Sequence, residues 1–309
     1  MTNEIQQSAN AVLMVRPHRF YPNPETAADN AFQKAVTAGE LPAVSAAAQV
    51  EFDRAVETLR AAEVTVHVVD DTATPEKPDA VFPNNWFSTH HDGRVALFPM
   101  YSATRRAERR HDVIEGLREH YRISEMIDYG ASEGEGRALE GTGSMVLDHV
   151  NKIAYASLSQ RTHLEVLRKF GEDFGYEPVT FRSESAPGRA IYHTNVMMCV
   201  GSEFALVGLQ NIPDEAERDG VQNLLEANGK EVLELTPAQI GEFSGNAIEL
   251  HNDREKLLVL SARAAAALIP AQRTALEKYA RLVPLTLPTV ELAGGSARCM
   301  IATIHLPRL

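Results

Sequence analysis

The stretch Asn85–Met100, NWFSTHHDGRVALFPM, has the form of a β-hairpin. Two runs of apolar and β-branched residues flank Asp92-Gly93, a dipeptide that favours a tight turn between antiparallel strands. The same form returns in residues 143–159, 194–210 and 245–261. After each hairpin comes a stretch with helical periodicity and then another short strand-like run. The chain therefore repeats one unit of strand, strand, helix and strand.

A fifth unit is divided between the two ends of the chain. Its hairpin, helix and last strand are residues 299–306 (CMIATIHL) with 11–17 (AVLMVRP), residues 46–63 and residues 64–69. Corresponding first residues of the units lie 51 to 58 positions apart, at Asn85, Gly143, Asn195, Asn246 and Cys299. A repeat near fifty residues whose ends complete one unit is typical of a closed ring. We expect one α/β domain, residues 1–309, built as a five-bladed pseudo-symmetric propeller closed by the N- and C-terminal strands.

Composition places the chain among ordinary globular proteins, with 44% hydrophobic and 23% charged residues. No apolar run is long enough to cross a bilayer, and the polar first residues do not resemble a signal peptide, so we expect a cytoplasmic location. The net charge of −12 argues against nucleic acid or an anionic membrane as a partner. It is compatible with a cationic or zwitterionic small molecule as a ligand but does not select one. The oligomeric state is not defined, and a homo-oligomer is one alternative.

Metal-binding patterns are weak in this sequence. The two cysteines, Cys199 and Cys299, do not form a disulfide framework, and no Cys-x-x-Cys or His-x-x-x-His pair supports a zinc site. His90 and His91 directly precede Asp92-Gly93, which favours a solvated turn over a pair of ligands. We therefore expect no metal.

In a closed ring, the residues that precede the first strand of each unit face a shared central cavity. Those positions hold Asp79, Glu140, His193 and Cys299. Taken singly, a turn aspartate, a solvated glutamate, a core histidine and an inert thiol are the simpler interpretations. Their matching places in the repeat favour a common site instead. Cys199 lies inside the apolar run VMMCVG, where a thiol packs as a small hydrophobe.

The side chains of this set suit covalent catalysis. A thiolate is a strong nucleophile, and an imidazole can protonate a leaving amine and then take a proton from water. A carboxylate bonded to the far ring nitrogen fixes the imidazole tautomer. A further carboxylate, here Asp79, can hold a planar group rich in N–H donors.

These residues resemble those of the guanidine-modifying enzyme superfamily, which includes arginine deiminases, dimethylarginine dimethylaminohydrolases, amidinotransferases and citrulline-utilisation hydrolases. The resemblance spans nearly the whole chain and is carried by Asp79-x-Val-Phe-x-x-Asn85, Glu140-Gly, His193 and the terminal Gly-Gly…Cys299. It implies the five-bladed α/β propeller known as the pentein fold. It also implies that Cys299 is the nucleophile, His193 the general acid and base, and Glu140 the residue that orients His193.

The resemblance further implies a set of substrate-binding residues. Asp79 would bind the planar head of the substrate, with Asn84 and Asn85 beside it. Arg161 and Arg105 are similar in context to arginines that bind a substrate carboxylate, and surface salt bridges are the alternative for both. Asn195 stands where deiminases and amidinotransferases tend to carry an aspartate. Residues 17–42 are long for a connector, and a lid or a static surface loop are the two alternatives.

The departures from the family concern the substrate. Dimethylarginine hydrolases carry acidic residues at the positions of Asn84 and Asn85, and Glu140 is followed by Gly-Thr-Gly143 instead of Gly-Gly-Asp. Fewer carboxylates suit a neutral ureido group better than a guanidinium cation. The citrulline-utilisation branch is the most similar, and we expect hydrolysis of L-citrulline to L-ornithine, ammonia and carbon dioxide without a cofactor. The alternatives are an arginine deiminase or other guanidino hydrolase, an amidinotransferase, and a non-enzymatic propeller that serves as a binding module.

Overall fold

The computed structural model describes residues 5–309 and contains five three-stranded sheets of one topology. In each sheet an antiparallel hairpin is followed by a third strand that pairs in parallel with the second. Four of the sheets are β3(Phe87–Thr89)–β4(Arg94–Leu97)–β5(Glu125–Asp128), β6(Val146–Asp148)–β7(Ile153–Ser157)–β8(Glu177–Phe181), β11(Met198–Val200)–β12(Phe204–Val207)–β13(Glu231–Glu234) and β14(Ile248–His251)–β15(Lys256–Ser261)–β16(Arg281–Leu285).

The fifth sheet joins the two ends of the chain, as the sequence predicted. Strand β17 (Ala302–Thr303) pairs antiparallel with β1 (Ala11–Arg16), and β1 pairs in parallel with β2 (Thr65–Asp70). β1 is nearly all buried because it is the central strand of its sheet and reads as an uninterrupted apolar run. A separate two-stranded sheet is formed by β9 (Glu184–Ala186) and β10 (Arg189–Ala190).

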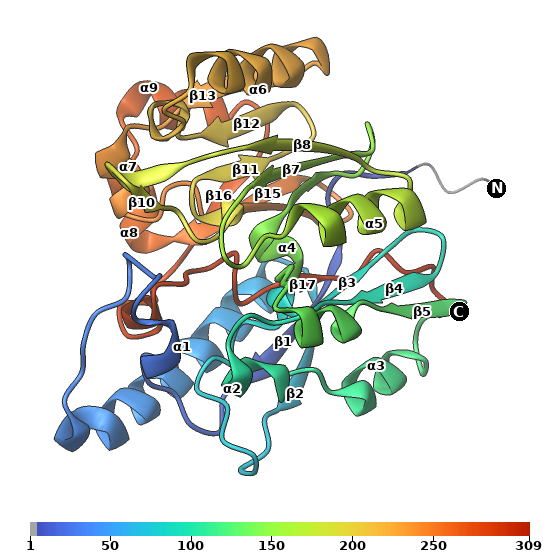
Figure 1. Ribbon diagram of the computed structural model, residues 1–309, viewed down its shortest axis with the longest axis vertical. Helices are drawn as coiled ribbons and strands as arrows, with labels where there is room; N and C mark the ends of the chain where they lie inside the picture. Colours follow the sequence, from blue (N-terminus) through green and yellow to red (C-terminus); the bar gives the residue numbers. More distant parts are fainter. Residues whose placement is uncertain (1–4) are drawn as a thin grey trace.

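Helices connect the second and third strands of each unit. They are α1 (Leu41–Ala61), α3 (His111–Leu117), α5 (Leu164–Phe174), α6 (Glu215–Ala227) and α9 (Pro270–Leu276). The apolar side of α5 is buried, and Gly175, at φ 72°, ends the helix in the left-handed conformation that glycine tolerates best. Figure 1 shows α1 and α6 at opposite ends of the molecule, with the short α4 (Gly141–Ser144) and β17 near its middle. Shorter helices are α2 (Ala103–Arg106), α7 (Pro237–Gly241) and α8 (Ala262–Ala267).

Consecutive sheets contact one another through their first strands. β17 contacts β3, β6 contacts β11, and β11 contacts β14, while α4 packs against both β3 and β6. Ala9, just before β1, forms a parallel bridge with Leu250 of β14. Backbone pairing does not merge the sheets into a closed sheet within residues 5–309. No helix of this part of the chain is long and apolar enough to span a membrane.

A short helical turn precedes the first strand of three sheets and brings the candidate residues together. The turns are η3 (Pro83–Asn85) before β3, α4 before β6 and η5 (Thr194–Val196) before β11. α4 contacts both η3 and η5. Cys299 lies in the corresponding turn before β17. Residues far apart in the sequence therefore meet at one end of the first strands.

Candidate active site

His193 and Glu140 form a buried pair at this end. Nε2 of His193 lies 2.8 Å from Oε2 of Glu140, and the backbone N–H of Tyr101 donates to the other carboxylate oxygen over 3.0 Å. Since the carboxylate accepts, Nε2 carries the proton and Nδ1 keeps its lone pair. The pair therefore leaves Nδ1 of His193 as the nitrogen that can exchange a proton with a substrate.

Gly143 makes room for the imidazole. A Cβ at this position would lie 2.7 Å from Nδ1 of His193 and 2.3 Å from Nδ2 of Asn85. Both distances are far below a normal van der Waals contact, so any side chain would displace the ring or the amide. A glycine at position 143, three residues after Glu140, is thus required by the close approach of His193 and Asn85.

Burial and neighbouring charges set the protonation of the pair. Burial lowers the pKa of His193 to about 4, against an opposing hydrogen bond and charge from Glu140. Burial would raise the pKa of Glu140, but Arg161, the His193 hydrogen bond and Arg105 together hold it well below its usual range. At neutral pH the site contains a neutral imidazole and an ionised carboxylate.

The thiol of Cys299 is held between two asparagine amides. Nδ2 of Asn246 lies 3.2 Å and Nδ2 of Asn195 lies 3.5 Å from Sγ. The backbone N–H of Arg298 donates to Oδ1 of Asn246 over 3.0 Å, which directs the NH₂ group of that amide to the sulfur. Two N–H donors favour a negative charge on sulfur. The predicted nucleophile therefore sits among groups that stabilise its reactive form.

Cys299 and His193 line the same small cavity, as the sequence predicted for a shared site. The cavity is lined by Thr26, Asn30, Asp79, Phe82, Asn85, Arg105, Arg161, Tyr192, His193, Ala293, Gly295 and Cys299. Asn84 is fully buried but is not one of the lining residues. Gly294, at φ 80°, lies close to Asn30. A Cβ at position 294 would be 2.5 Å from the side-chain amide of Asn30.

Arg105 is buried and already paired within the protein, so it is not part of a surface salt bridge. Its Nε and Nη2 each lie 2.9 Å from a carboxylate oxygen of Glu108, and Nη2 also donates to Oδ1 of Asn85 over 3.0 Å. Asp79 and Glu140 lie 3.7 and 3.4 Å away. Burial raises the pKa of Glu108 to about 7 against the lowering effect of Arg105. The positive charge of Arg105 thus compensates the negative charges of several buried carboxylates. Sequence reasoning did not identify Glu108 as the main partner of Arg105.

Arg161 is also buried, and its partner comes from the long N-terminal loop. Asp29 accepts from Nε and Nη2 of Arg161 over 2.6 and 2.7 Å, while the guanidinium carbon lies 4.7 Å from the centre of the Tyr192 ring. From the same loop, Nδ2 of Asn23 donates to Oδ2 of Asp79 over 2.8 Å. Loop residues therefore contact both groups that the resemblance assigns to the two ends of a substrate.

Asn85 presents a donor without a partner. Because a guanidinium only donates, the hydrogen bond from Arg105 fixes Oδ1 on that side and turns Nδ2 away from it. Nδ2 is buried and has no hydrogen-bond partner among the described residues, and neither side-chain polar atom of Asn84 has one. A buried N–H without an acceptor is unfavourable, so this amide is suited to an acceptor on a bound ligand.

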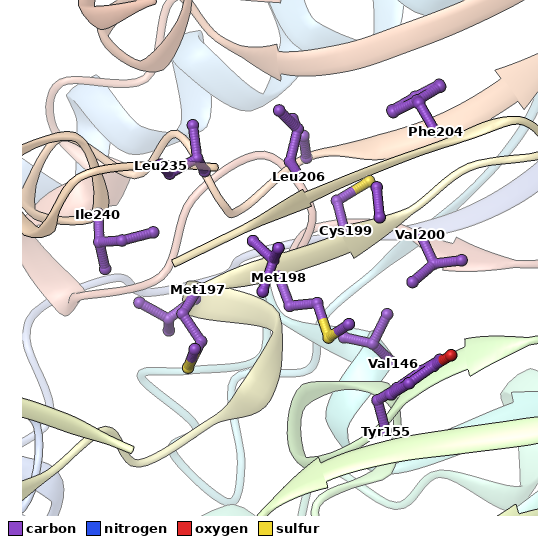
Figure 2. Close-up of a cluster of buried hydrophobic side chains, with 14 of the residues drawn as sticks. Val146, Tyr155, Met197, Met198, Cys199, Val200, Phe204, Leu206, Leu235 and Ile240 are labelled. Carbon is purple, nitrogen blue, oxygen red and sulfur yellow. The ribbon is translucent and has the colours of Figure 1, made fainter. Parts of the chain in front are cut away.

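Two expectations about other residues meet different outcomes. Cys199 lies on β11 within a large apolar cluster, as predicted, and burial raises the pKa of its thiol to about 12 (Figure 2).

His90 and His91 precede a turn, but the prediction that both are solvated is wrong. His90 is only 2% exposed, because its ring packs 4.1 Å from that of Phe174 in the next unit.

These features define a member of the guanidine-modifying enzyme superfamily, which confirms the resemblance seen in the sequence. Within it, the chain belongs to the family N,N dimethylarginine dimethylhydrolase, eukaryotic, whose sequence model matches residues 16–306. A comparison with curated proteins gives no match.

Solved structures share the fold at low sequence identity. The N-terminal domain of ArgZ, an arginine dihydrolase from the ornithine–ammonia cycle in cyanobacteria, superimposes with a TM-score of 0.73 at 16% identity, over 97% of this chain and 99% of that domain. AgrE in complex with ornithine and NAD+ gives 0.75 at 15%, over 96% of this chain and 39% of its own. A dimethylarginine dimethylaminohydrolase adduct with S-methyl-L-thiocitrulline gives 0.64 at 14%, over 97% and 100% of the two chains.

Proposed function

We propose that this protein hydrolyses a C–N bond of a ureido or guanidino amino acid through a covalent intermediate on Cys299, with L-citrulline as the preferred substrate. The observation that carries the proposal is one cavity lined by both Cys299 and His193. The thiol of Cys299 lies beside the amide N–H groups of asparagines, and the neutral imidazole of His193 is paired with the buried carboxylate of Glu140. A nucleophile, a base and a group that orients the base are the parts that covalent acyl-transfer chemistry needs.

In the first half-reaction, Sγ of Cys299 attacks the ureido carbon while Nδ1 of His193 accepts the thiol proton. The tetrahedral intermediate collapses by breaking the bond from that carbon to the side-chain nitrogen of citrulline. His193 gives its proton to this nitrogen, so L-ornithine leaves and an S-carbamoyl enzyme remains. Glu140 stabilises the imidazolium that forms between the two proton transfers.

In the second half-reaction, water attacks the carbamoyl carbon and His193 takes its proton. The C–S bond breaks, carbamate leaves, and Cys299 recovers its proton from His193. Carbamate then decomposes to ammonia and carbon dioxide. No step calls for a metal or an organic cofactor.

Asn85 favours a ureido over a guanidinium group. Its Nδ2 lies against Gly143, as does Nδ1 of His193, and needs an acceptor, which a ureido oxygen supplies and a guanidinium cannot. The cavity lining also holds two arginines and only one carboxylate, Asp79, which disfavours a cationic head group. A guanidino substrate is the second candidate, and the family match is the observation that favours it.

Asp79 would accept from the NH₂ of the ureido group, and Arg161 would bind the α-carboxylate of the amino acid. In the present conformation Asn23 and Asp29 make the corresponding contacts, an amide N–H on Asp79 and a carboxylate on Arg161. The loop that carries them must therefore move before the substrate can bind. This assigns the N-terminal loop the role of a lid.

The contacts between consecutive sheets support a closed five-bladed propeller around this site. β17 contacts β3, β6 contacts β11 and β11 contacts β14, α4 links the sheets of β3 and β6, and the bridge from Ala9 to Leu250 links the sheets of β14 and β1. Such a ring explains how residues from separate units converge on one cavity.

A substrate panel tests the function. L-citrulline, L-arginine, dimethylarginine and agmatine are incubated with the protein, and ornithine, citrulline and ammonia are quantified. We expect ornithine and ammonia from citrulline, and no product from a Cys299→Ala variant. Asn85→Asp replaces the donor by a carboxylate and should lower the preference for citrulline over arginine by about ten- to a hundred-fold. Citrulline released from arginine, with citrulline itself inert, would identify a deiminase instead.

A further inference from the structure

A second cluster lies at the opposite ends of the same first strands. His91 is in the turn after β3, His149 in the turn after β6, and His305 follows β17. One ring nitrogen from each histidine lies within 4.8 Å of the others. The catalytic residues precede these strands, so this triad of histidines (His91, His149 and His305) is separate from the active site.

We propose that this triad binds a divalent transition-metal ion of the zinc type. Neutral imidazoles are preferred ligands of Zn²⁺, and three of them with one open position form a common tetrahedral set. With Zn–N bonds of about 2.0–2.1 Å, the ligand nitrogens must come within about 3.4 Å of one another, so the rings must turn toward a common point from their present separation of up to 4.8 Å. The ion would join three turns that belong to three different sheets.

The hydrogen bonds of His91 and His149 within residues 5–309 each use one ring nitrogen. Nε2 of His91 lies 3.1 Å from the carbonyl oxygen of Gln6, which can only accept, so Nε2 holds the proton and Nδ1 keeps a lone pair. Nδ1 of His149 lies 2.7 Å from the hydroxyl of Tyr176, and when Nδ1 donates to this hydroxyl Nε2 keeps a lone pair. Partners on the far nitrogen are what orient histidines that ligate metals.

His305 supplies the independent observation that points to a ligand. Its side chain is 7% exposed, and Nδ1 is buried without a hydrogen-bond partner among the described residues. Its ring packs against that of His149 at an interplanar angle of 40°, with centres 4.1 Å apart. This ring packing leaves the buried Nδ1 of His305 without a hydrogen bond, which is unfavourable. A metal ion would provide the partner that the triad lacks.

The surroundings permit an ion to enter. His91 and His305 line a solvent-open cavity together with Gln6, Ser8 and His251, which gives room for a water molecule as a fourth ligand. His149 and His305 also line a small cavity with the cation Arg298, the carboxylate Glu249 and the thiol of Cys199. Arg298 donates to the carbonyl oxygen of Ile301 and forms no ion pair with Glu249 within residues 5–309, so coordination by the three imidazoles must outweigh repulsion from this cation.

Metal titration of the full chain tests the proposal, in a Cys299→Ala background that removes the reactive thiol as a competing ligand. Calorimetry with ZnCl₂ should give one ion per chain and a higher Tm, because the ion binds the folded state. MgCl₂ should do neither, because Mg²⁺ prefers oxygen ligands. Binding of Zn²⁺ to the active site instead would persist in the triad variants and would overturn the assignment.

Substitutions localise the ion. His91→Gln lies on a partly exposed turn, and it should weaken Zn²⁺ binding at least ten-fold, as should His149→Gln and His305→Gln. Tyr176→Phe keeps all three ligands and should weaken binding by about ten- to a hundred-fold, the usual effect of losing the partner of a ligating histidine. The matched control His251→Gln removes a histidine of the same surface outside the triad and should leave binding unchanged. Equal Zn²⁺ affinity in His91→Gln and His251→Gln, or no binding at all, would contradict the proposal.

Discussion

The two cysteines of this protein are equally buried but lie in opposite surroundings. Cys299 and Cys199 are each 3% exposed. Cys299 lies beside two amide donors and shares a cavity with His193, whereas Cys199 belongs to a large apolar cluster on β11 (Figure 2) and also lines a small cavity with Glu249 and Arg298. Burial, with the charge of Glu249 acting in the same direction, raises the pKa of Cys199 to about 12. The exposed fraction of a thiol therefore says little about its reactivity, which depends on the donors and the base around it.

Replacing each thiol in turn should produce the largest contrast. Cys299→Ala removes the nucleophile, and we expect kcat for citrulline to fall by about 1000-fold or more, with the Tm nearly unchanged. Cys199→Ala leaves the site intact and should keep kcat within about two-fold, while the loss of packing destabilises the fold by roughly 1 kcal/mol. Steady-state kinetics and thermal unfolding of both variants measure the two effects. Equal loss of activity in both variants would mean that fold stability, not the Cys299 thiol, limits the reaction.

Thiol alkylation should sharpen the same contrast. Iodoacetamide at neutral pH should modify Cys299 roughly 100-fold faster than Cys199, which should react only after unfolding. Asn246→Ala removes the nearer amide donor and should slow alkylation of Cys299 about ten-fold, because a hydrogen bond to a charged group contributes about 1.5–3 kcal/mol. Peptide mapping by mass spectrometry assigns the modified residue. An unchanged rate in Asn246→Ala would show that this amide does not stabilise the thiolate.

The pH dependence should give the smallest effect. Since burial lowers the pKa of His193 to about 4, the base form is present throughout the neutral range. We expect kcat/KM to stay level from pH 7 to about 5 and to fall only as His193 takes up a proton. Cys199, with a pKa near 12, should contribute no alkaline limb below about pH 10. An acid limb centred near the ordinary histidine value of about 6.5 would contradict the protonation state assigned to the site.

The repeat made much of this arrangement predictable. The spacing of the hairpins located the strands of all five sheets, and it indicated that β17 and β1 would pair across the length of the chain. Equivalent positions in the repeat also placed Glu140, His193 and Cys299 at one end of the first strands. These positions could be read from sequence because each one recurs at a fixed place in a periodic pattern.

The contacts made by irregular segments could not be predicted in this way. Asp29 and Asn23 belong to a long loop without periodicity, so nothing in the sequence indicated that they would reach Arg161 and Asp79. The pairing of Arg105 with Glu108 was missed because a short polar helix gives no signal of burial. The burial of His90 depends on Phe174, which follows it by many residues and reaches it only in the folded state.

The most direct test of the central claim is to trap the intermediate on Cys299. The protein is mixed with L-citrulline, quenched in acid within milliseconds, and analysed by intact-mass and peptide mass spectrometry. We predict an adduct with the mass of one carbamoyl group, confined to the peptide that contains Cys299 and absent from the peptide that contains Cys199. Turnover of citrulline with no adduct on Cys299 at any quench time, and full activity in Cys299→Ala, would contradict the account.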